Sequence, residues 1–229
     1  MHDGGRARVA LVIPALDEAA AIGPVVRAVP AGLVDQVVVV DNGSTDGTGA
    51  AARAAGARVV IEPRRGYGAA CWAGVQALDP PIDVVAFLDG DGSQDPAELP
   101  RLLAPLWRDE ADLVLGIRRF EAGGHPRHAV LCTLAVALVL RYRYGLALRD
   151  LGPFRAVRRS ALERLALQDR GYGWPVEMIV KAARSGLRIG QVEVSHRPRQ
   201  GGRSKVAGTL GGSVRAGWRF LAVALRDGR

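Results

Sequence analysis

The stretch "DVVAFLDGDGSQDPAELP" (residues 83–100) joins an apolar run, two closely spaced carboxylates and a polar turn that ends at Pro96. The apolar run is continuous rather than alternating, which predicts a strand covered on both faces, as in a parallel α/β sheet. Charges at the end of a buried strand are costly unless a cation neutralises them. Asp89 and Asp91 therefore raise the question of which cation they serve.

Similar apolar runs alternate with helical patterns along the first half of the chain. The expected strands cover residues 8–15, 36–41, 57–61, 83–89 and 111–117, and the expected helices cover residues 17–29, 44–56, 66–78 and 96–108. Ser44 or Thr45 is expected to N-cap the second of these helices. The alternation predicts an α/β fold with a mostly parallel central sheet flanked by helices. In such a sheet the ligand site lies at the carboxyl ends of the strands.

The second half of the chain is less regular. A Gly/Pro loop from residue 121 leads into an apolar helix that ends near residue 144, and an irregular stretch follows. A helix over 174–186, a strand over 187–196 and a basic, Gly-rich loop over 197–205 are expected next. Neither a linker nor a repeat interrupts the chain, so we expect one domain over 1–229 with a basic C-terminal elaboration.

The charge of the chain is divided unevenly. Residues 1–115 carry 9 Arg and no Lys against 16 acidic residues, a net charge of −7, whereas residues 116–229 carry 22 Lys and Arg against 7 acidic residues, a net charge of +15. The division predicts an acidic half that holds a cation and a basic half that faces an anionic partner.

Several classes of protein are excluded by the sequence. The N-terminus lacks the pattern of a signal peptide, and the longest apolar run, over 129–140, is too short to span a bilayer. Gln94 and Pro100 occupy positions where an EF-hand needs Gly and Glu. The glycine signatures of a dinucleotide site and of a P-loop are absent. The basic half shows no recognised nucleic-acid-binding module, which counts against that class. We expect a cytoplasmic protein, either free or peripheral on the membrane.

Two carboxylates spaced i, i+2 at a strand end can reach one small volume, and Gly90 and Gly92 keep that volume clear. Carboxylate oxygens suit Mg²⁺ or Mn²⁺, which proteins often share with substrate phosphates. A single strand-end Asp is more often a cap or turn residue. Acids at several strand ends favour a shared cation site.

The motifs resemble those of inverting family-two glycosyltransferases with the GT-A fold, over nearly the whole chain. The first-half motifs are "VALVIPALDEAAAI", "VVVVDNGSTDGT", "RRGYGAACWAGV" and "FLDGDGSQDP", and the second-half motifs are "GIRR", "RDLGPFRAVRR", "WPVEMIVKAARSGLRIGQVEV" and "RPRQGGRSK". The second set is similar to the dolichyl-phosphate mannose synthase branch. The resemblance implies transfer of a hexose from a nucleotide diphosphate sugar, of the GDP-mannose or UDP-glucose type, to a polyprenyl phosphate.

The resemblance implies a role for each matching residue. Residues 1–117 would bind the nucleotide sugar and residues 118–229 the acceptor. The implied nucleotide-sugar contacts are Pro14, Leu16, Glu18, Asp41, Asp46, Asp89 and Asp91, with Asp46 equally suited to cap the following helix. The implied ligands of Mg²⁺ or Mn²⁺ are Asp89, Asp91 and Ser93, the last acting through water. The implied acceptor or phosphate contacts are Arg118, Arg127, Asp150, Arg155, Arg203, Ser204 and Lys205. Asp91, Glu177, Arg203 and Lys205 would be catalytic.

The acceptor has two interpretations. Transfer to a hydroxyl needs a general base, usually supplied in this superfamily by a Glu-Asp pair, and here Glu177 lacks an adjacent Asp. A phosphate is already ionised, which favours a polyprenyl phosphate at an anionic membrane surface. The alternative is a soluble hydroxyl acceptor with Glu177 or Asp150 as base. A non-catalytic nucleotide-binding or nucleic-acid-binding module is the distant alternative.

Overall fold

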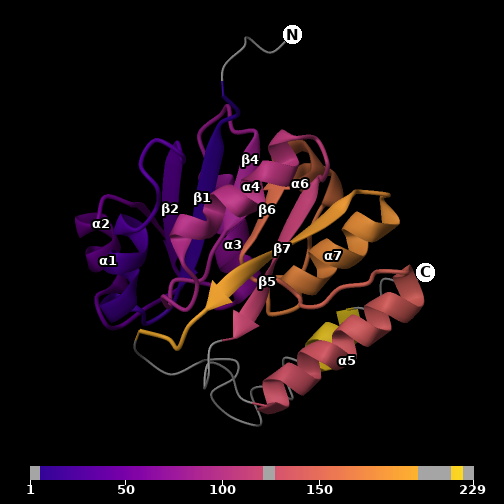
Figure 1. The fold of residues 1–229 in the computed structure, drawn as a ribbon. Coiled ribbons are helices and arrows are strands. Elements are labelled where there is room, and N and C mark those ends of the chain that lie inside the picture. Colours follow the sequence, from indigo (N-terminus) through magenta and orange to yellow (C-terminus); the bar gives the residue numbers. More distant parts are fainter. Residues whose placement is uncertain (1–5, 121–126, 201–217, 224–229) are drawn as a thin grey trace.

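A seven-stranded sheet forms the centre of the molecule (Figure 1). The computed structural model describes residues 6–120, 127–200 and 218–223. The strands are β1 (Val9–Ala15), β2 (Gln36–Asp41), β3 (Arg58–Ile61), β4 (Val84–Phe87), β5 (Leu113–Phe120), β6 (Arg155–Arg158) and β7 (Ile189–His196). The helices are α1 (Ala19–Arg27), α2 (Thr48–Ala54), α3 (Tyr67–Gln76), α4 (Leu99–Trp107), α5 (Arg127–Tyr144), α6 (Arg159–Leu165) and α7 (Trp174–Arg184), with a 3-10 turn at Pro96–Glu98.

The strand order is β3-β2-β1-β4-β6-β5-β7, and β6 runs antiparallel to both of its neighbours while the other pairings are parallel. The predicted mostly parallel α/β sheet is therefore confirmed. β1 shows why its sequence is apolar throughout. Leu11 packs in the core on one face with α1, α2 and α4, while Val12 packs in the core on the other face with α3 and α7. Both side chains are fully buried, as the continuous run predicts.

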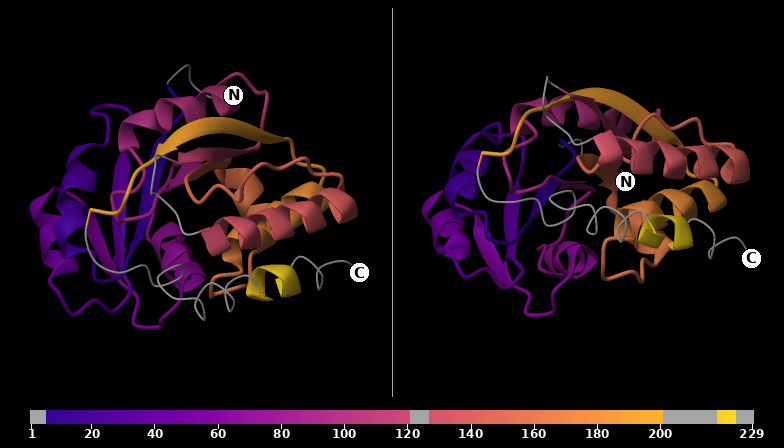
Figure 2. Two further views of the ribbon diagram at one scale, coloured as in Figure 1. Left: turned by 60° about the horizontal axis from the view of Figure 1, so that its bottom comes forward. Right: turned by 90° about the horizontal axis from the view of Figure 1, so that it is seen from below.

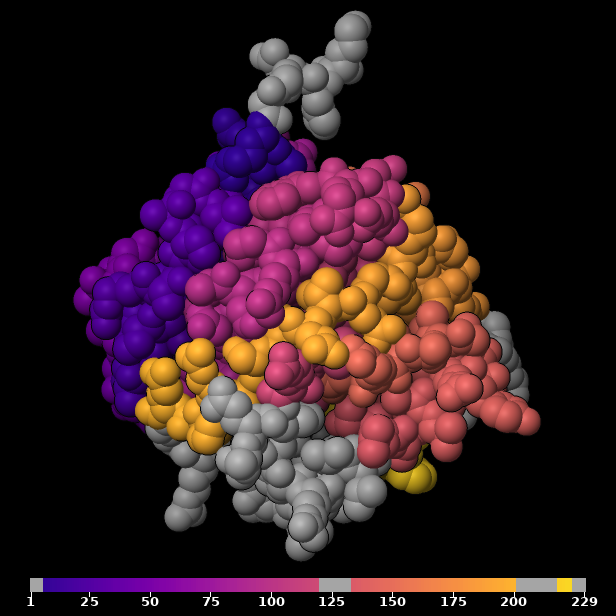
Figure 3. Space-filling model, viewed as in Figure 1, coloured from indigo at the N-terminus to yellow at the C-terminus, as the bar shows by residue number. Residues whose placement is uncertain are grey.

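The helices form a layer on each face of the sheet. Figure 2 shows the molecule turned so that its lower side faces the reader. In the space-filling view of Figure 3, the atoms of α4 and β7 lie next to each other on the face seen in Figure 1. None of the helices in the described part of the chain is both long enough and apolar enough to cross a bilayer.

The irregular stretch after α5 contains a strand that the sequence did not predict. β6 is only four residues long and reads Arg-Ala-Val-Arg, which is not an apolar run. It lies in the sheet between β4 and β5. Its first arginine, Arg155, is buried there because its guanidinium donates to the carbonyls of Leu151, Gly152 and Pro175.

The predicted N-cap of the second helix was wrong. α2 begins at Thr48, and its N-cap is Gly47 at a φ of 90°. Ser44 and Thr45 lie in the preceding turn, where the Ser44 hydroxyl accepts the Asp17 amide and the Thr45 amide donates to Asp17 Oδ1. The two hydroxyl residues connect two loops instead of capping a helix.

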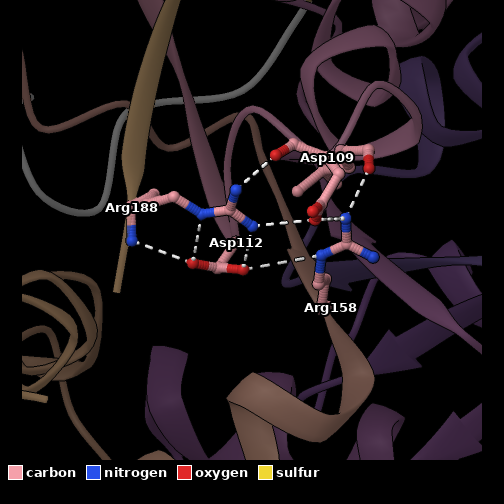
Figure 4. A network of polar contacts seen from close by, with 5 residues as sticks. Asp109, Asp112, Arg158 and Arg188 are labelled. Atoms are coloured by element: carbon pink, nitrogen blue, oxygen red, sulfur yellow. Dashed lines mark hydrogen bonds and ion pairs between the residues drawn. The ribbon is translucent and has the colours of Figure 1, made fainter. Parts of the chain in front are cut away.

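Charged side chains fix the end of the sheet opposite the carboxyl ends of β1 and β4. Arg188, just before β7, lies between Asp109 and Asp112, with Nη2–Oδ1 distances of 2.8 and 3.0 Å (Figure 4). Arg158 at the end of β6 pairs with Asp109 at 2.8 Å. The network joins the loop before β5 to β6 and β7, and it has a structural role.

Replacing Gly74 of α3 with alanine is expected to destabilise the fold by about 1–3 kcal/mol, because an added methyl group overpacks a filled core. A Cβ there would lie 2.4 Å from Val12 Cγ1 and 3.0 Å from Val40 Cγ2. Gly23→Ala in α1 is the matched control, since its Cβ meets only the flexible Arg27 side chain. Urea unfolding measures both variants. Equal stability of the two would contradict the tight packing of α3 on β1.

Candidate active site

A cavity of about 290 Å³ opens at the carboxyl ends of β1, β2 and β4. Each strand delivers residues to it from its last positions or from the loop that follows. The lining residues are Pro14, Ala15, Leu16, Glu18, Asn42, Arg65, Gly66, Tyr67, Ala70, Asp89, Gly90, Asp91, Tyr172 and Arg199. The structure thus brings together Pro14, Leu16, Glu18, Asp89 and Asp91 from the predicted nucleotide-sugar site, at the sheet edge where an α/β fold places its ligands.

The two carboxylates after β4 face the cavity in different surroundings. Asp91 is 8% exposed, and its Oδ1 accepts the Ser93 amide at 2.9 Å. Asp89 accepts a hydrogen bond from the Tyr67 hydroxyl at 3.2 Å. Burial raises the pKa of Asp89 to about 6, and the charge of Asp91 adds to that shift. A cation placed between the two carboxylates relieves this repulsion.

The residues of this turn fit a divalent metal that is shared with a substrate. No cluster of three or more potential metal-ligating side chains occurs in the described ranges 6–120, 127–200 and 218–223. Two carboxylates with open space beside them match the way Mg²⁺ is bound in phosphate-transfer sites, where substrate oxygens and waters complete the coordination shell. Ser93 is 2% exposed and is not among the lining residues, so the structure does not bring it to the cavity.

The remaining strand-end acids of the first half stabilise loops. Asp41 Oδ1 accepts the Ser44 amide at 2.8 Å, and Asp41 does not line the cavity. Asp46 accepts the amides of Ala19 and Thr48, both at 3.0 Å, and so caps the first turns of α1 and α2. Asp46 does not line the cavity, so these contacts favour its role at the helix ends over a contact with the nucleotide sugar.

Tyr67, Asn42 and Arg65 line the cavity and were missed by the sequence analysis. Burial and the charge of Asp89 raise the pKa of Tyr67, which keeps its hydroxyl neutral and able to donate. The Asn42 side chain donates to the carbonyls of Glu62 and Arg64 and accepts the Gly66 amide, so it shapes the loop before α3. Tyr67 belongs to the "RRGYG" motif, but its contact with Asp89, 22 residues away, has no local sequence signal.

Arg118 and Asp150 form a buried, bidentate pair. Arg118 Nε and Nη2 each lie 2.7 Å from an Asp150 oxygen, and the Arg118 amide donates to the same carboxylate. Burial alone would raise the pKa of Asp150, but the hydrogen bonds and charge of Arg118 outweigh burial and hold that pKa below its ordinary value. Asp150 is therefore an ionised partner of Arg118 rather than a group ready to take a proton.

The structure does not bring Arg155 or Glu177 to the cavity. Arg155 is 1% exposed and donates to the main-chain carbonyls of Gly152 and Leu151. The Glu177 carboxylate accepts the amides of Gln168 and Asp169 and pairs with Lys181 at 2.8 Å. These contacts give Glu177 a structural role, because they occupy the oxygens that a general base would use. The side chain of Arg127 and all of Arg203, Ser204 and Lys205 lie outside the described residues.

The loop held by Glu177 forms a wall of the cavity. The amides of Gly68 and Ala69 donate to the carbonyls of Gly171 and Arg170, which places Tyr172 at the cavity. A Cβ on Gly68 would lie 2.3 Å from the Asp169 carbonyl, so this approach requires glycine. Asp169 pairs with Arg219 at 2.7 Å and so ties the segment 218–223, seen beside α5 in Figure 2, to the same loop.

Arg199 is a cation that lines the cavity and pairs with its acidic residues. Its Nη1 lies 2.8 Å from Asp91 Oδ2, and its Nη2 pairs with Glu18. This residue belongs to the predicted Gly-rich basic loop, in which Arg203, Ser204 and Lys205 were the expected phosphate contacts. A contact between residues 18 and 199 carries no local sequence signal.

Comparisons with known proteins agree with this geometry. The profile of the family described as "Glycosyl transferase family 2" matches residues 10–166. An uncharacterized glycosyltransferase of Mycobacterium tuberculosis is 46% identical over 207 residues, which cover 90% of this chain and 93% of that protein. The undecaprenyl-phosphate mannosyltransferase of Micrococcus luteus is 36% identical over 225 residues, which cover 90% of each.

A solved structure is also similar. The glucosyl-3-phosphoglycerate synthase of Mycobacterium tuberculosis, in complex with Mn²⁺, UDP and glucosyl-3-phosphoglycerate, aligns with a TM-score of 0.78 and 30% identity. The alignment covers 97% of this chain and 80% of that one. The predicted GT-A fold is thereby confirmed, and the structural relative holds a divalent metal together with a nucleoside diphosphate.

Proposed function

The chain belongs to glycosyl transferase family 2, and we propose that it is a metal-dependent, inverting enzyme that moves a hexose from a nucleotide diphosphate sugar to a polyprenyl phosphate. Its membership and its named relatives make it a glycosyltransferase. The undecaprenyl-phosphate mannosyltransferase among those relatives supports the lipid phosphate as acceptor.

One observation carries the choice of acceptor: the two candidate bases are engaged elsewhere. Glu177 is bound to main-chain amides and Lys181, and Asp150 is bound to Arg118. Among the described residues that line the cavity, the acids are Glu18, Asp89 and Asp91. Asp89 and Asp91 form the proposed metal pair, and Glu18 pairs with Arg199. A phosphate acceptor suits this site because it is already ionised and needs no base.

Asp89 and Asp91 would hold Mg²⁺ or Mn²⁺, which stabilises the charge of the departing diphosphate when bound. Pro14, Leu16 and Glu18 would contact the nucleoside side of the donor. In the transfer step, an oxygen of the acceptor phosphate forms a bond to the anomeric carbon while the bond from that carbon to the diphosphate oxygen breaks. The nucleoside diphosphate leaves with the electron pair. The site therefore acts by positioning and electrostatics.

The donor would lie mostly on residues 1–117 and the acceptor on residues 118–229, although Tyr172 and Arg199 carry the second half into the donor cavity. Arg118 lies near enough to Asp89 and Asp91 to interact with their charges. Its Nε and Nη2 donate to Asp150 and it does not line the cavity, so its positive charge, rather than those donors, would act on the acceptor phosphate beside the metal. Arg203, Ser204 and Lys205 would close over the diphosphate, and the net charge of +15 in residues 116–229 would draw in an anionic acceptor.

Nucleotide release with and without acceptor tests the proposal. The enzyme is incubated with GDP-mannose or UDP-glucose and Mn²⁺, alone or with a short-chain polyprenyl phosphate in detergent. We expect release that depends on the lipid phosphate and labelled hexose in the lipid product. Transfer to phosphoglycerate instead would favour the soluble-acceptor alternative, to which the similarity with glucosyl-3-phosphoglycerate synthase points. Release that ignores both acceptors would contradict both versions.

A face of α5 is suited to the membrane that such an acceptor occupies. Leu134, Leu138 and Tyr142 are 52%, 64% and 95% exposed and recur every four residues, so they form one stripe, and Arg141 and Arg143 are exposed beside its end. An apolar stripe with flanking arginines is typical of helices that lie on anionic bilayers.

The double substitution L134S/L138S is expected to weaken binding to anionic vesicles by about tenfold or more, because two partly exposed leucines no longer enter the lipid. Flotation with vesicles of phosphatidylglycerol and phosphatidylcholine measures the change. Ile61→Ser on β3 is the control, since Ile61 is 65% exposed at the opposite edge of the sheet. If both variants lost vesicle binding equally, or if neither lost it, α5 would not be the membrane-binding face.

A further inference from the structure

We propose that Arg199 is a resident counter-cation of the donor site: its guanidinium holds Glu18 and Asp91 and would compete with a divalent cation for Asp91. The inference rests on the proposed function, since it assigns the metal to Asp89 and Asp91. Its consequence is that metal and nucleoside diphosphate bind cooperatively.

The contacts of Arg199 place a positive charge where the metal is needed. Nη1 lies 2.8 Å from Asp91 Oδ2, while the Ser93 amide donates to the other oxygen of that carboxylate. Nη2 pairs with Glu18, whose side chain is 8% exposed. Two nearly buried carboxylates without a cation would be costly, so the guanidinium stabilises this arrangement.

The backbone delivers Arg199 to this position. The Arg197 amide donates to the Ser93 carbonyl at 2.8 Å, and the Gln200 amide donates to the Asp91 carbonyl at 3.1 Å. Gly92, at a φ of 72°, permits the approach, because a Cβ there would lie 2.9 Å from Gln200 Cδ. Figure 2 shows this segment crossing from β7 toward the side of the sheet that carries β1 and α1. Arg199 is therefore held at the acidic turn by main-chain hydrogen bonds.

The same side chain has capacity left for an anion. Its Nε is buried and has no hydrogen-bond acceptor among the described residues. A guanidinium donates through five N–H groups, and its planar fork matches phosphate oxygens. When a diphosphate enters with the metal, its oxygens can accept the donors that Asp91 gives up. Metal alone displaces Arg199 without offering it a new acceptor, whereas metal and diphosphate together offer one.

This competition predicts how the affinity for a divalent cation depends on bound nucleoside diphosphate, even without hexose transfer. Without nucleotide, a divalent cation must overcome the repulsion of Arg199 and break its ion pair with Asp91. With UDP or GDP present, both costs fall, so each ligand increases the affinity for the other by the same factor. Removing the Arg199 charge should raise the affinity for metal alone and reduce that coupling factor.

The test is Mn²⁺ binding measured by the electron paramagnetic resonance signal of free Mn²⁺, with and without UDP or GDP. We expect Arg199→Met to bind Mn²⁺ alone about tenfold more tightly than the wild-type protein and to lose about the same factor of coupling. Arg199→Lys keeps a positive charge and is expected to stay within a few-fold of the wild type. Arg197→Met is the matched control, because Arg197 pairs with Asp95, which does not line the cavity.

The outcomes separate this inference from the function on which it rests. Two results would overturn the role of Arg199 and leave the transferase proposal standing. The first is that folded Arg199→Met binds Mn²⁺ alone no more tightly than the wild type. The second is that Arg197→Met gains the same affinity for Mn²⁺ as Arg199→Met. Wild-type protein that binds no Mn²⁺ even with both nucleotides would overturn the metal site and the inference together. Circular dichroism spectra establish that each variant is folded.

Discussion

Asp91→Asn is expected to lower the rate of hexose transfer by about a thousandfold, which would be the largest effect of a single substitution at the cavity. Asparagine is nearly isosteric and can still accept the Ser93 amide through its carbonyl oxygen. It removes the negative charge that would hold the metal and that pairs with Arg199. Nucleotide release in the presence of lipid phosphate measures the rate, and Mn²⁺ titration measures the metal affinity.

Asp95→Asn is the control for this variant. Asp95 follows Asp91 in the same turn, caps the Pro96–Glu98 turn through the Ala97 amide and pairs with Arg197. Asparagine preserves a cap of this kind, so activity should change little. If Asp91→Asn retained activity within about tenfold of the wild type, the metal would not lie at Asp91.

Asp150→Asn is expected to destabilise the protein by about 3–5 kcal/mol, because it leaves the Arg118 guanidinium charged and without its carboxylate in a buried place. The side chains of Arg118 and Asp150 are only 11% and 6% exposed. Urea unfolding at neutral pH measures the change. Glu110→Gln is the control, since Glu110 forms an exposed pair with Arg108 and should have little effect.

The loss of stability caused by Asp150→Asn should become smaller as the pH falls. Arg118 holds the pKa of Asp150 below its ordinary value, so the folded state favours the ionised carboxylate. The stabilisation is fully present above the pKa of an unfolded Asp, about 3.9, and is lost as the pH falls through the lower folded pKa. The stability difference between wild type and variant should therefore shrink below about pH 4. A difference that grows on acidification would show that the pair does not stabilise the fold.

Sequence predicts the fold of the first half well because its signal is local. The runs that became β1, β2 and β4 are buried on both faces, and each is followed by a turn and a helix. β6 escapes detection because Arg155 looks like a surface residue. Its burial depends on carbonyls at positions 151, 152 and 175, which converge only in the folded chain.

The candidate site shows the same limit at the level of side chains. Asp89 and Asp91 reach the cavity as predicted, whereas Asp46 and Glu177 have carboxylates engaged by main-chain amides. A carboxylate that caps a loop and one that binds a ligand need the same residue type, so sequence alone does not separate them. Arg199 was missed because its partner Glu18 lies at the other end of the sequence, so no local pattern indicates the contact.

A competition between acceptors tests the central claim most directly. The wild-type protein is incubated with labelled GDP-mannose or UDP-glucose, Mn²⁺ and equal amounts of a short-chain polyprenyl phosphate and phosphoglycerate, and the products are identified by mass spectrometry. We predict that the hexose appears on the lipid phosphate, with no product on phosphoglycerate. Hexose found on phosphoglycerate alone would contradict the claim that this site serves an acceptor that needs no base.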